Sequence, residues 1–171
     1  MEPITYREFQ DALRLAKRAW HLELRDTYKV TYEKAPIARW RNGEPEDFAF
    51  LEEWLSFVRE VTDRGLAVER LRLVTFPHTE YTRWSLFVAE QNVAAGEDVR
   101  YLPIREPLGV ALPAEDCWLL DDDRLILSLF APDGEAGGFA REEDPELIAE
   151  YRAVRDALWP MGISHSEYVT R

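Results

Sequence analysis

The stretch that decides the fold is residues 79–103, TEYTRWSLFVAEQNVAAGEDVRYLP. Thr79 is a residue type that caps helix N-termini, and Gly96 is the type that ends helices. Between them, aromatic and aliphatic residues recur at helical spacing. Residues 99–102 then read as a short strand that Pro103 closes. A capped helix followed at once by a strand predicts an α/β architecture.

The segments before this stretch repeat the pattern. Thr5 and Glu8 have the spacing of a capping box, which predicts a helix from there to near Trp20. Alternation around Leu22 and Leu24 then predicts a strand. A second helix is expected from the proline-containing start at residues 44–45 to Gly65, and residues 68–76 read as the next strand.

The segments after it add antiparallel structure. Residues 117–120 and 125–130 are apolar runs joined by the acidic turn 121–123, which predicts a hairpin. Asp144 and Pro145 are an N-cap and a first-turn proline, so a last helix should begin there. Residues 34–46 and 131–144 read as loops. We therefore expect one α/β domain over residues 1–171. Its sheet should be mixed and mostly parallel, with about five strands, helices on both faces, and a C-terminal hairpin plus helix.

Composition limits the classes of function. The chain has 171 residues with a formal net charge of −12, and a surface that acidic repels nucleic acid and anionic membranes. Its single cysteine, Cys117, lies in an apolar run and predicts a buried, inert thiol. We find no signal peptide and no apolar run long enough for a membrane span, so a cytoplasmic location is expected.

Motifs that bind metals or phosphates are absent from the sequence. His21, His78 and His165 are far apart, and no second ligand stands at metal-binding spacing from any of them. No glycine-rich phosphate loop follows an expected strand. We therefore predict no metal, no cofactor and no catalytic residue.

One expected sheet face is rich in charge. His21, Glu23 and Arg25 alternate with leucines, with Asp26 next to them, and Arg70 and Arg72 share a face of a second strand. If the two strands are neighbours, these groups gather. Such a face is either a partly solvated surface held by ion pairs or a cleft that recognises anions.

Two further groups are candidates for binding a ligand or partner. Glu80 and Arg83 are three residues apart on the third helix and can pair, while Tyr81 and Trp84 face one way, toward the core or a partner. In the tail, His165 and Tyr168 suggest a docked chain end with a possible recognition role.

Several segments in combination resemble a family of small actinobacterial proteins classed as a domain of unknown function. These segments are LELRDTY at 22–28, TEYTRW at 79–84, NVAAGEDVRYLP at 92–103, the hairpin CWLLDDDRLILSLF at 117–130 and SHSEY at 164–168. Members of that family often stand beside helix-turn-helix regulators and small partner proteins. The resemblance implies a regulatory or partner-binding role and assigns no active site.

Three functions remain open from the sequence. The first is a non-catalytic module that binds a protein partner, such as a helix-turn-helix regulator. The second is an enzyme or sensor for a small anionic ligand that uses the arginine-lined sheet face. The third is an acidic, antitoxin-like protein that mimics nucleic acid.

Overall fold

A computed structural model describes residues 1–105 and 107–170. One sheet runs through it, with strand order β1-β7-β6-β5-β2-β3-β4-β8. Its strands are β1 (Glu2–Ile4), β2 (Arg18–Glu23), β3 (Ala67–Val74), β4 (Asp98–Pro103), β5 (Asp116–Leu120), β6 (Arg124–Phe130), β7 (Ala136–Glu142) and β8 (Ile163–Ser164). The helices are α1 (Tyr6–Arg14), α2 (Lys34–Arg41), α3 (Glu52–Asp63), α4 (Glu80–Ala95), α5 (Pro145–Leu158) and α6 (His165–Tyr168), with 3-10 turns at Thr31–Glu33, Ala49–Leu51 and Trp159–Met161.

The expected α/β class with a mixed sheet is confirmed, but the strand number and the dominant direction are wrong. The sheet has eight strands instead of about five. Among the strands of the described residues, the pairs β2–β3 and β3–β4 are parallel and the other pairs are antiparallel. The expected hairpin exists as β5–β6, yet it pairs with β2 in the middle of the sheet instead of forming an edge.

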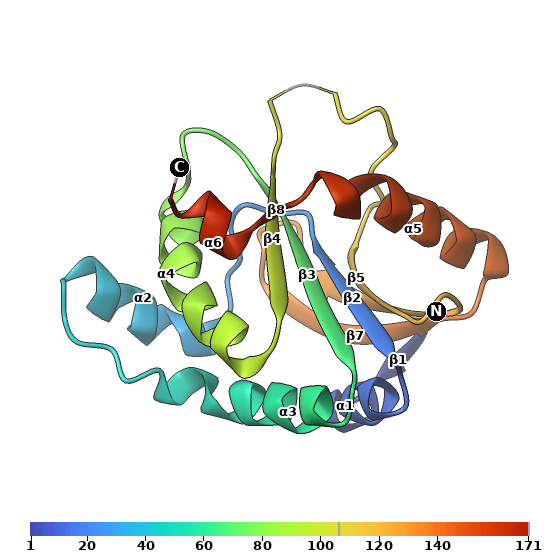
Figure 1. Ribbon diagram of the computed structural model, residues 1–171, viewed down its shortest axis with the longest axis horizontal. Coiled ribbons are helices and arrows are strands. Elements are labelled where there is room, and N and C mark those ends of the chain that lie inside the picture. Colours follow the sequence, from blue (N-terminus) through green and yellow to red (C-terminus); the bar gives the residue numbers. More distant parts are fainter. Residues whose placement is uncertain (106, 171) are drawn as a thin grey trace.

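Alternate residues of the central strands build two cores on opposite faces of the sheet. Trp20, Leu22 and Leu71 pack with side chains of α5 on one face. Ala19 and Val68 pack with side chains of α1 and α3 on the other face. Figure 1 shows α5 on one side of the central strands, with α4 and α2 on the other. Helices therefore cover both faces, as expected.

Three of the four helix starts that the sequence marked are confirmed, and the one at residues 44–45 is not. Thr5 and Glu8 form a capping box, and Thr79 and Asp144 cap α4 and α5 with their side chains. Each of these side-chain oxygens accepts a hydrogen bond from a first-turn N–H that would otherwise lack a partner.

Other element boundaries differ from expectation. The first helix ends at Arg14 and Trp20 lies in β2, while α3 begins at Glu52 and not near residue 44. Both segments expected to be loops contain regular structure, because α2 lies within 34–46 and β7 within 131–144. Among the described residues, no helix is long and apolar enough to cross a membrane.

Candidate functional site

The parallel pairing of β2 and β3 gathers the charged sheet face that the sequence singled out. His21 lies opposite Arg70 and Glu23 opposite Arg72 in the register of the two strands. The carboxylate of Glu23 accepts from both arginines: Arg70 Nη1 contacts its Oε1, and Arg72 Nε lies 2.5 Å from its Oε2. The two strands are therefore neighbours, which is the condition under which these groups gather.

A fourth charged group, Glu97, completes this arrangement. It follows Gly96, whose left-handed backbone (φ +114°) turns the chain from α4 into β4. Arg70 Nε lies 2.9 Å from Glu97 Oε2, and Glu97 Oε1 accepts from Trp54 Nε1 at 2.6 Å and Asn92 Nδ2 at 2.9 Å. We call Glu23, Arg70, Arg72 and Glu97 the buried ion cluster.

The buried ion cluster is closed to solvent. The exposed fraction is 7% for Glu23 and 3% for Glu97, and both arginine side chains are almost covered. The cross-strand ion pairs expected for this face are present, but the face is more deeply covered than the expected partly solvated surface. The two carboxylates balance the two guanidinium groups, so the cluster carries no net charge, as buried charges require.

The field of the arginines fixes the protonation of Glu23. Burial alone would raise the pKa of Glu23, but the nearby guanidinium groups of Arg72 and Arg70 outweigh it and lower the pKa to about 2. The Glu23 carboxylate therefore stays ionised at neutral pH, and its low basicity makes it a poor proton acceptor.

His21 is neutral beside this cluster. Burial and the charge of Arg70 lower the pKa of its imidazole to about 3. The ring stacks on Trp118 with centroids 4.2 Å apart, and Nδ1 lies 3.6 Å from Glu23 Oε1, beyond a good hydrogen bond. Among the described residues, Nδ1 has no hydrogen-bond partner. The His21–Glu23 pair thus lacks the geometry of a working acid–base dyad.

Two further buried carboxyl groups lie near the cluster, and the sequence did not reveal either. Asp116 accepts from the Tyr28 hydroxyl at 2.5 Å and from the Leu24 amide at 3.0 Å. Glu33 accepts from the Tyr81 hydroxyl at 2.9 Å. Burial raises the pKa of each carboxyl group to about 7. No local motif marks them, because both are defined by contacts with distant residues.

The four candidate residues of α4, the third helix expected from the sequence, have different partners and do not form one site. Glu80 pairs with Arg41 at 2.5 Å, whereas Arg83 donates to the His78 carbonyl, so the suggested pairing of Glu80 with Arg83 is wrong. Trp84 is buried in the core, and Tyr81 points to Glu33. None of these four residues belongs to the buried ion cluster.

The tail is docked, as the sequence suggested. The His165 imidazole Nδ1 lies 3.0 Å from the Tyr101 hydroxyl, and the Tyr168 ring stacks on Tyr101 at 4.6 Å between centroids. The Tyr168 hydroxyl lies 3.0 Å from His78 Nε2. These contacts fix α6 against β4, next to the edge strand β8.

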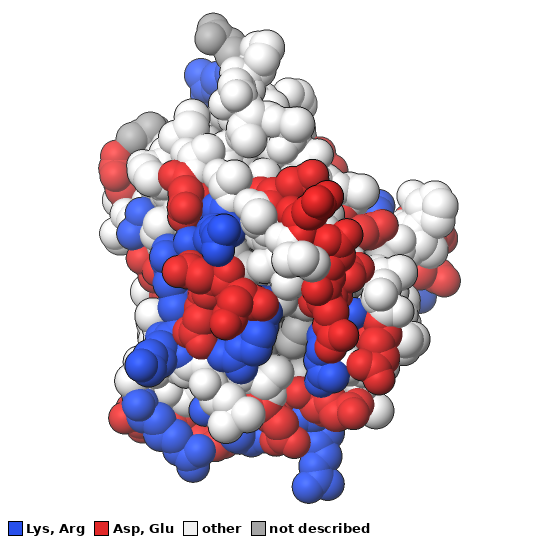
Figure 2. All heavy atoms as spheres, turned by 90° about the vertical axis from the view of Figure 1, so that its right-hand side faces the viewer, with Lys and Arg blue, Asp and Glu red and all other residues white. Residues whose placement is uncertain are grey.

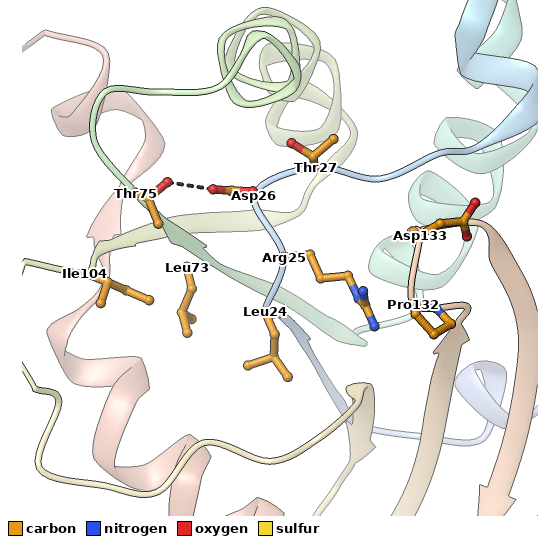
Figure 3. Close-up of a pocket in the computed structure, with 10 residues that line it drawn as sticks. Leu24, Arg25, Asp26, Thr27, Leu73, Thr75, Ile104, Pro132 and Asp133 are labelled. Atoms are coloured by element: carbon orange, nitrogen blue, oxygen red, sulfur yellow. Dashed lines mark hydrogen bonds between the residues drawn. The ribbon is translucent and has the colours of Figure 1, made fainter.

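Arg25 and Asp26 lie beyond the end of β2, away from the buried ion cluster. They line a cavity of about 380 Å³ together with Leu24, Thr27, Leu73, Thr75, Ile104, Pro132, Asp133 and Gly134. Figure 3 shows the Arg25 side chain reaching toward Pro132, and Asp26 bonded to Thr75. We call this cavity the strand-end pocket. It is open to solvent, whereas the buried ion cluster is almost covered.

Metal-binding groups do not gather in the described part of the chain. Within residues 1–105 and 107–170, no three His, Cys, Asp or Glu side chains are placed to hold one ion. Cys117 is buried, and burial raises the pKa of its thiol well above the usual range, which fits the inert thiol expected from the sequence.

Comparison with known proteins gives a family and no activity. No curated protein matches the chain. The family described as a domain of unknown function, DUF6879, matches residues 7–170, which is nearly the whole chain. The chain therefore belongs to the DUF6879 family.

Proposed function

We propose that this protein is a non-catalytic binding module of the cytoplasm that acts through a protein partner with a basic surface. The observation that carries this proposal is how the charge is distributed. The buried ion cluster is neutral, so the net charge of −12 comes from groups outside it, which include exposed acids such as Glu143, Glu146 and Glu150.

The chemistry of the charged sheet face supports a structural role for it. Its two arginines already bind Glu23 and Glu97, so neither guanidinium fork is free for an anionic ligand. His21 and Glu23 are buried, with pKa values of about 3 and 2, far from the neutral range in which general acids and bases work best. The anion-recognising interpretation of this face therefore loses its support.

The surface around α5 offers a better candidate. We define the acidic face as Glu143, Asp144, Glu146, Glu150 and Asp156 together with the turn 121–123. The turn and the helix are joined, because Arg155 contacts the Asp121 carbonyl and the Asp122 carboxylate. Figure 2, which views the side on which α5 begins, shows dense areas of acidic side chains with basic side chains next to them.

Carboxylates on the acidic face outnumber the guanidinium groups of Arg124, Arg152 and Arg155. Among the described residues, Glu143, Glu146 and Glu150 form no ion pair. Such unpaired acids favour the approach of a basic protein and give a strong dependence on ionic strength. A DNA-binding helix-turn-helix regulator, of the kind implied by the resemblance to actinobacterial proteins, has a basic surface of this type.

A charge-reversal experiment tests the proposal. A partner captured from a lysate of the source cells is purified, and its Kd is measured by calorimetry at two salt concentrations. The variant Glu143→Lys/Glu146→Lys/Glu150→Lys should bind at least about tenfold more weakly, since each of the three lost attractions contributes roughly 0.5 kcal/mol and each added lysine repels a basic partner.

The matched control reverses three exposed acids elsewhere. Glu53→Lys/Asp63→Lys/Glu90→Lys changes the net charge equally on α3 and α4, and it should leave the Kd within about twofold. Equal losses in the two variants would mean that total charge, and not the acidic face, drives binding. The absence of any reproducible partner would contradict the proposal itself.

The nucleic-acid-mimicking function is a variant of the same idea. The gathering of acids around α5 favours it, because such a protein must present its carboxylates on one face. Competition separates it from ordinary partner binding. If this protein mimics nucleic acid, the partner's own nucleic acid competes for the same site and displaces it. If this protein binds the partner at another site, the partner, its nucleic acid and this protein form a ternary complex.

A further inference from the structure

We propose that the strand-end pocket binds a small organic monocarboxylate, whose charged group pairs with Arg25 and whose apolar body lies against Leu24, Leu73 and Ile104. This inference goes beyond the proposed function and does not depend on it. It rests on the position of the pocket, on the state of Arg25, and on the charges and apolar groups around it.

The pocket lies where α/β sheets commonly bind ligands. Leu24 and Arg25 directly follow β2, and Thr75 directly follows β3, so the pocket is at the carboxyl ends of two adjacent parallel strands. The turn between β6 and β7 supplies Pro132, Asp133 and Gly134 on the far side. A volume of about 380 Å³ is at the lower end of the range for small-molecule sites.

Arg25 differs from the arginines of the buried ion cluster. Among the described residues, its guanidinium group has no hydrogen-bond or ion-pair partner. It passes over the Phe130 ring, with Cζ 5.7 Å from the centroid, and its positive charge also acts on the pKa of the Asp116 carboxyl group. The side chain is half-buried. A guanidinium fork in that setting matches a carboxylate bidentately, and an incoming carboxylate replaces water at little cost.

The other charged groups of the pocket are already engaged. Asp26 accepts from the Thr75 hydroxyl at 2.6 Å, and Asp133 pairs with Lys29 at 3.2 Å. Their negative charges still repel a doubly charged ligand at short range. The carboxylates of Asp26 and Asp133 balance the cations of Arg25 and Lys29, so there is no excess positive charge, and this favours a monoanion over a phosphate dianion.

The opposite part of the pocket is apolar. Figure 3 shows Ile104, Leu73 and Leu24 following one another from the outer side of the sheet toward Arg25. Leu24 and Ile104 are partly exposed, whereas Leu73 is 2% exposed, so chiefly the first two provide a wall for a hydrocarbon chain or ring, which gains from leaving water. A ligand with one carboxylate and an apolar body of several carbons fits both ends of the pocket.

Octanoate is a suitable probe for this pocket. Octanamide is the comparison ligand with the same chain length and no charge, and octyl phosphate is the comparison ligand with a higher negative charge. Isothermal titration of the full chain should show octanoate binding most tightly, and amide chemical shifts should move in segments 24–27 and 131–135. Equal binding of octanamide would show that Arg25 contributes nothing, and it would overturn the proposal. Tighter binding of octyl phosphate would overturn the preference for a monoanion.

The variant Arg25→Gln removes the fork and should weaken octanoate binding by about tenfold or more. Arg59→Gln removes the same charge from the exposed surface of α3, so it controls for net charge and should leave the affinity unchanged. Thermal melts should show that both variants are folded. An unchanged octanoate affinity in folded Arg25→Gln, or no octanoate binding by the parent chain at millimolar concentration, would refute the inference.

Discussion

Replacing Glu97 by glutamine tests whether the buried ion cluster holds the sheet and α4 together. The Glu97 carboxylate accepts hydrogen bonds from Arg70, Trp54 and Asn92, and it is 3% exposed. Glutamine keeps the shape but removes the charge. Its amide NH₂ group then faces donors, so at least one of the four bonds that these three residues donate is lost.

The magnitude follows from the charge balance of the cluster. Without the Glu97 charge, Glu23 alone must neutralise both Arg70 and Arg72, and one buried positive charge is left uncompensated. Breaking a buried pair in this way costs about 3–5 kcal/mol. We therefore expect Glu97→Gln to lose that much free energy of unfolding.

Urea denaturation followed by tryptophan fluorescence measures this loss, provided that the m-value is unchanged. The control is Glu80→Gln, which breaks the exposed pair with Arg41 and should cost about 0–1 kcal/mol. The double variant Arg70→Gln/Glu97→Gln restores neutrality and should lose less than the sum of its single variants. A loss below about 1 kcal/mol in Glu97→Gln would refute the cluster's structural role.

Two further predictions concern pH and backbone geometry. Burial raises the pKa of Asp116 to about 7, above its value of about 3.8 in the unfolded chain, so the folded state binds more protons between these values. The contribution of Asp116 to stability should therefore fall as the pH rises from 4 to 7, by at most about 1.4 kcal/mol per pH unit. Urea melts across this range should show Asp116→Asn gaining relative to the parent chain, and parallel pH profiles would contradict the assignment. Gly96→Ala places a Cβ 2.9 Å from Thr62 Oγ1 at a φ of +114° and should cost more than about 1 kcal/mol. In Gly65→Ala, φ is +96° and no atom lies within 4 Å of the new Cβ, so its cost should be smaller; equal melting temperatures in the two variants would show that the contact with Thr62 is unimportant.

Local signals in the sequence predicted helix starts well. Thr5, Thr79 and Asp144 cap helices because a cap depends on residues only a few positions away. Helix α2 was missed because only Pro36 of its eight residues is buried, so no apolar stripe marks it. Strand β7 was missed because the sequence AGGFARE contains two glycines, which are rare in strand interiors.

Pairing between strands that are far apart in the sequence could not be predicted from local sequence patterns. Alternating helices and strands correctly predicted parallel neighbours for β2, β3 and β4. The pairing of β5 with β2 joins segments about a hundred residues apart, and neither strand encodes its partner. The hairpin therefore entered the centre of the sheet, and the expected parallel majority was wrong.

The candidate site was predictable in part for the same reason. Period-2 alternation placed His21 and Glu23 on one face of their strand and put Arg70 and Arg72 together on one face of theirs. Their meeting then required that the strands be neighbours with these faces on the same side of the sheet. The role of Glu97 could not be predicted from the sequence, because it depends on the turn at Gly96 and on a hydrogen bond from Trp54 of α3. Burial of the face depends on the same tertiary contacts.

Titration of the His21 imidazole by NMR tests most directly whether the charged sheet face is a closed structural core. Our account places His21 against Trp118 and beside the arginines, with a pKa of about 3, so its Hε1 resonance should not shift between pH 5 and pH 8. A His21 titration midpoint near 6.5 would mean that the imidazole is open to solvent and protons, and the face would again be a candidate reactive centre.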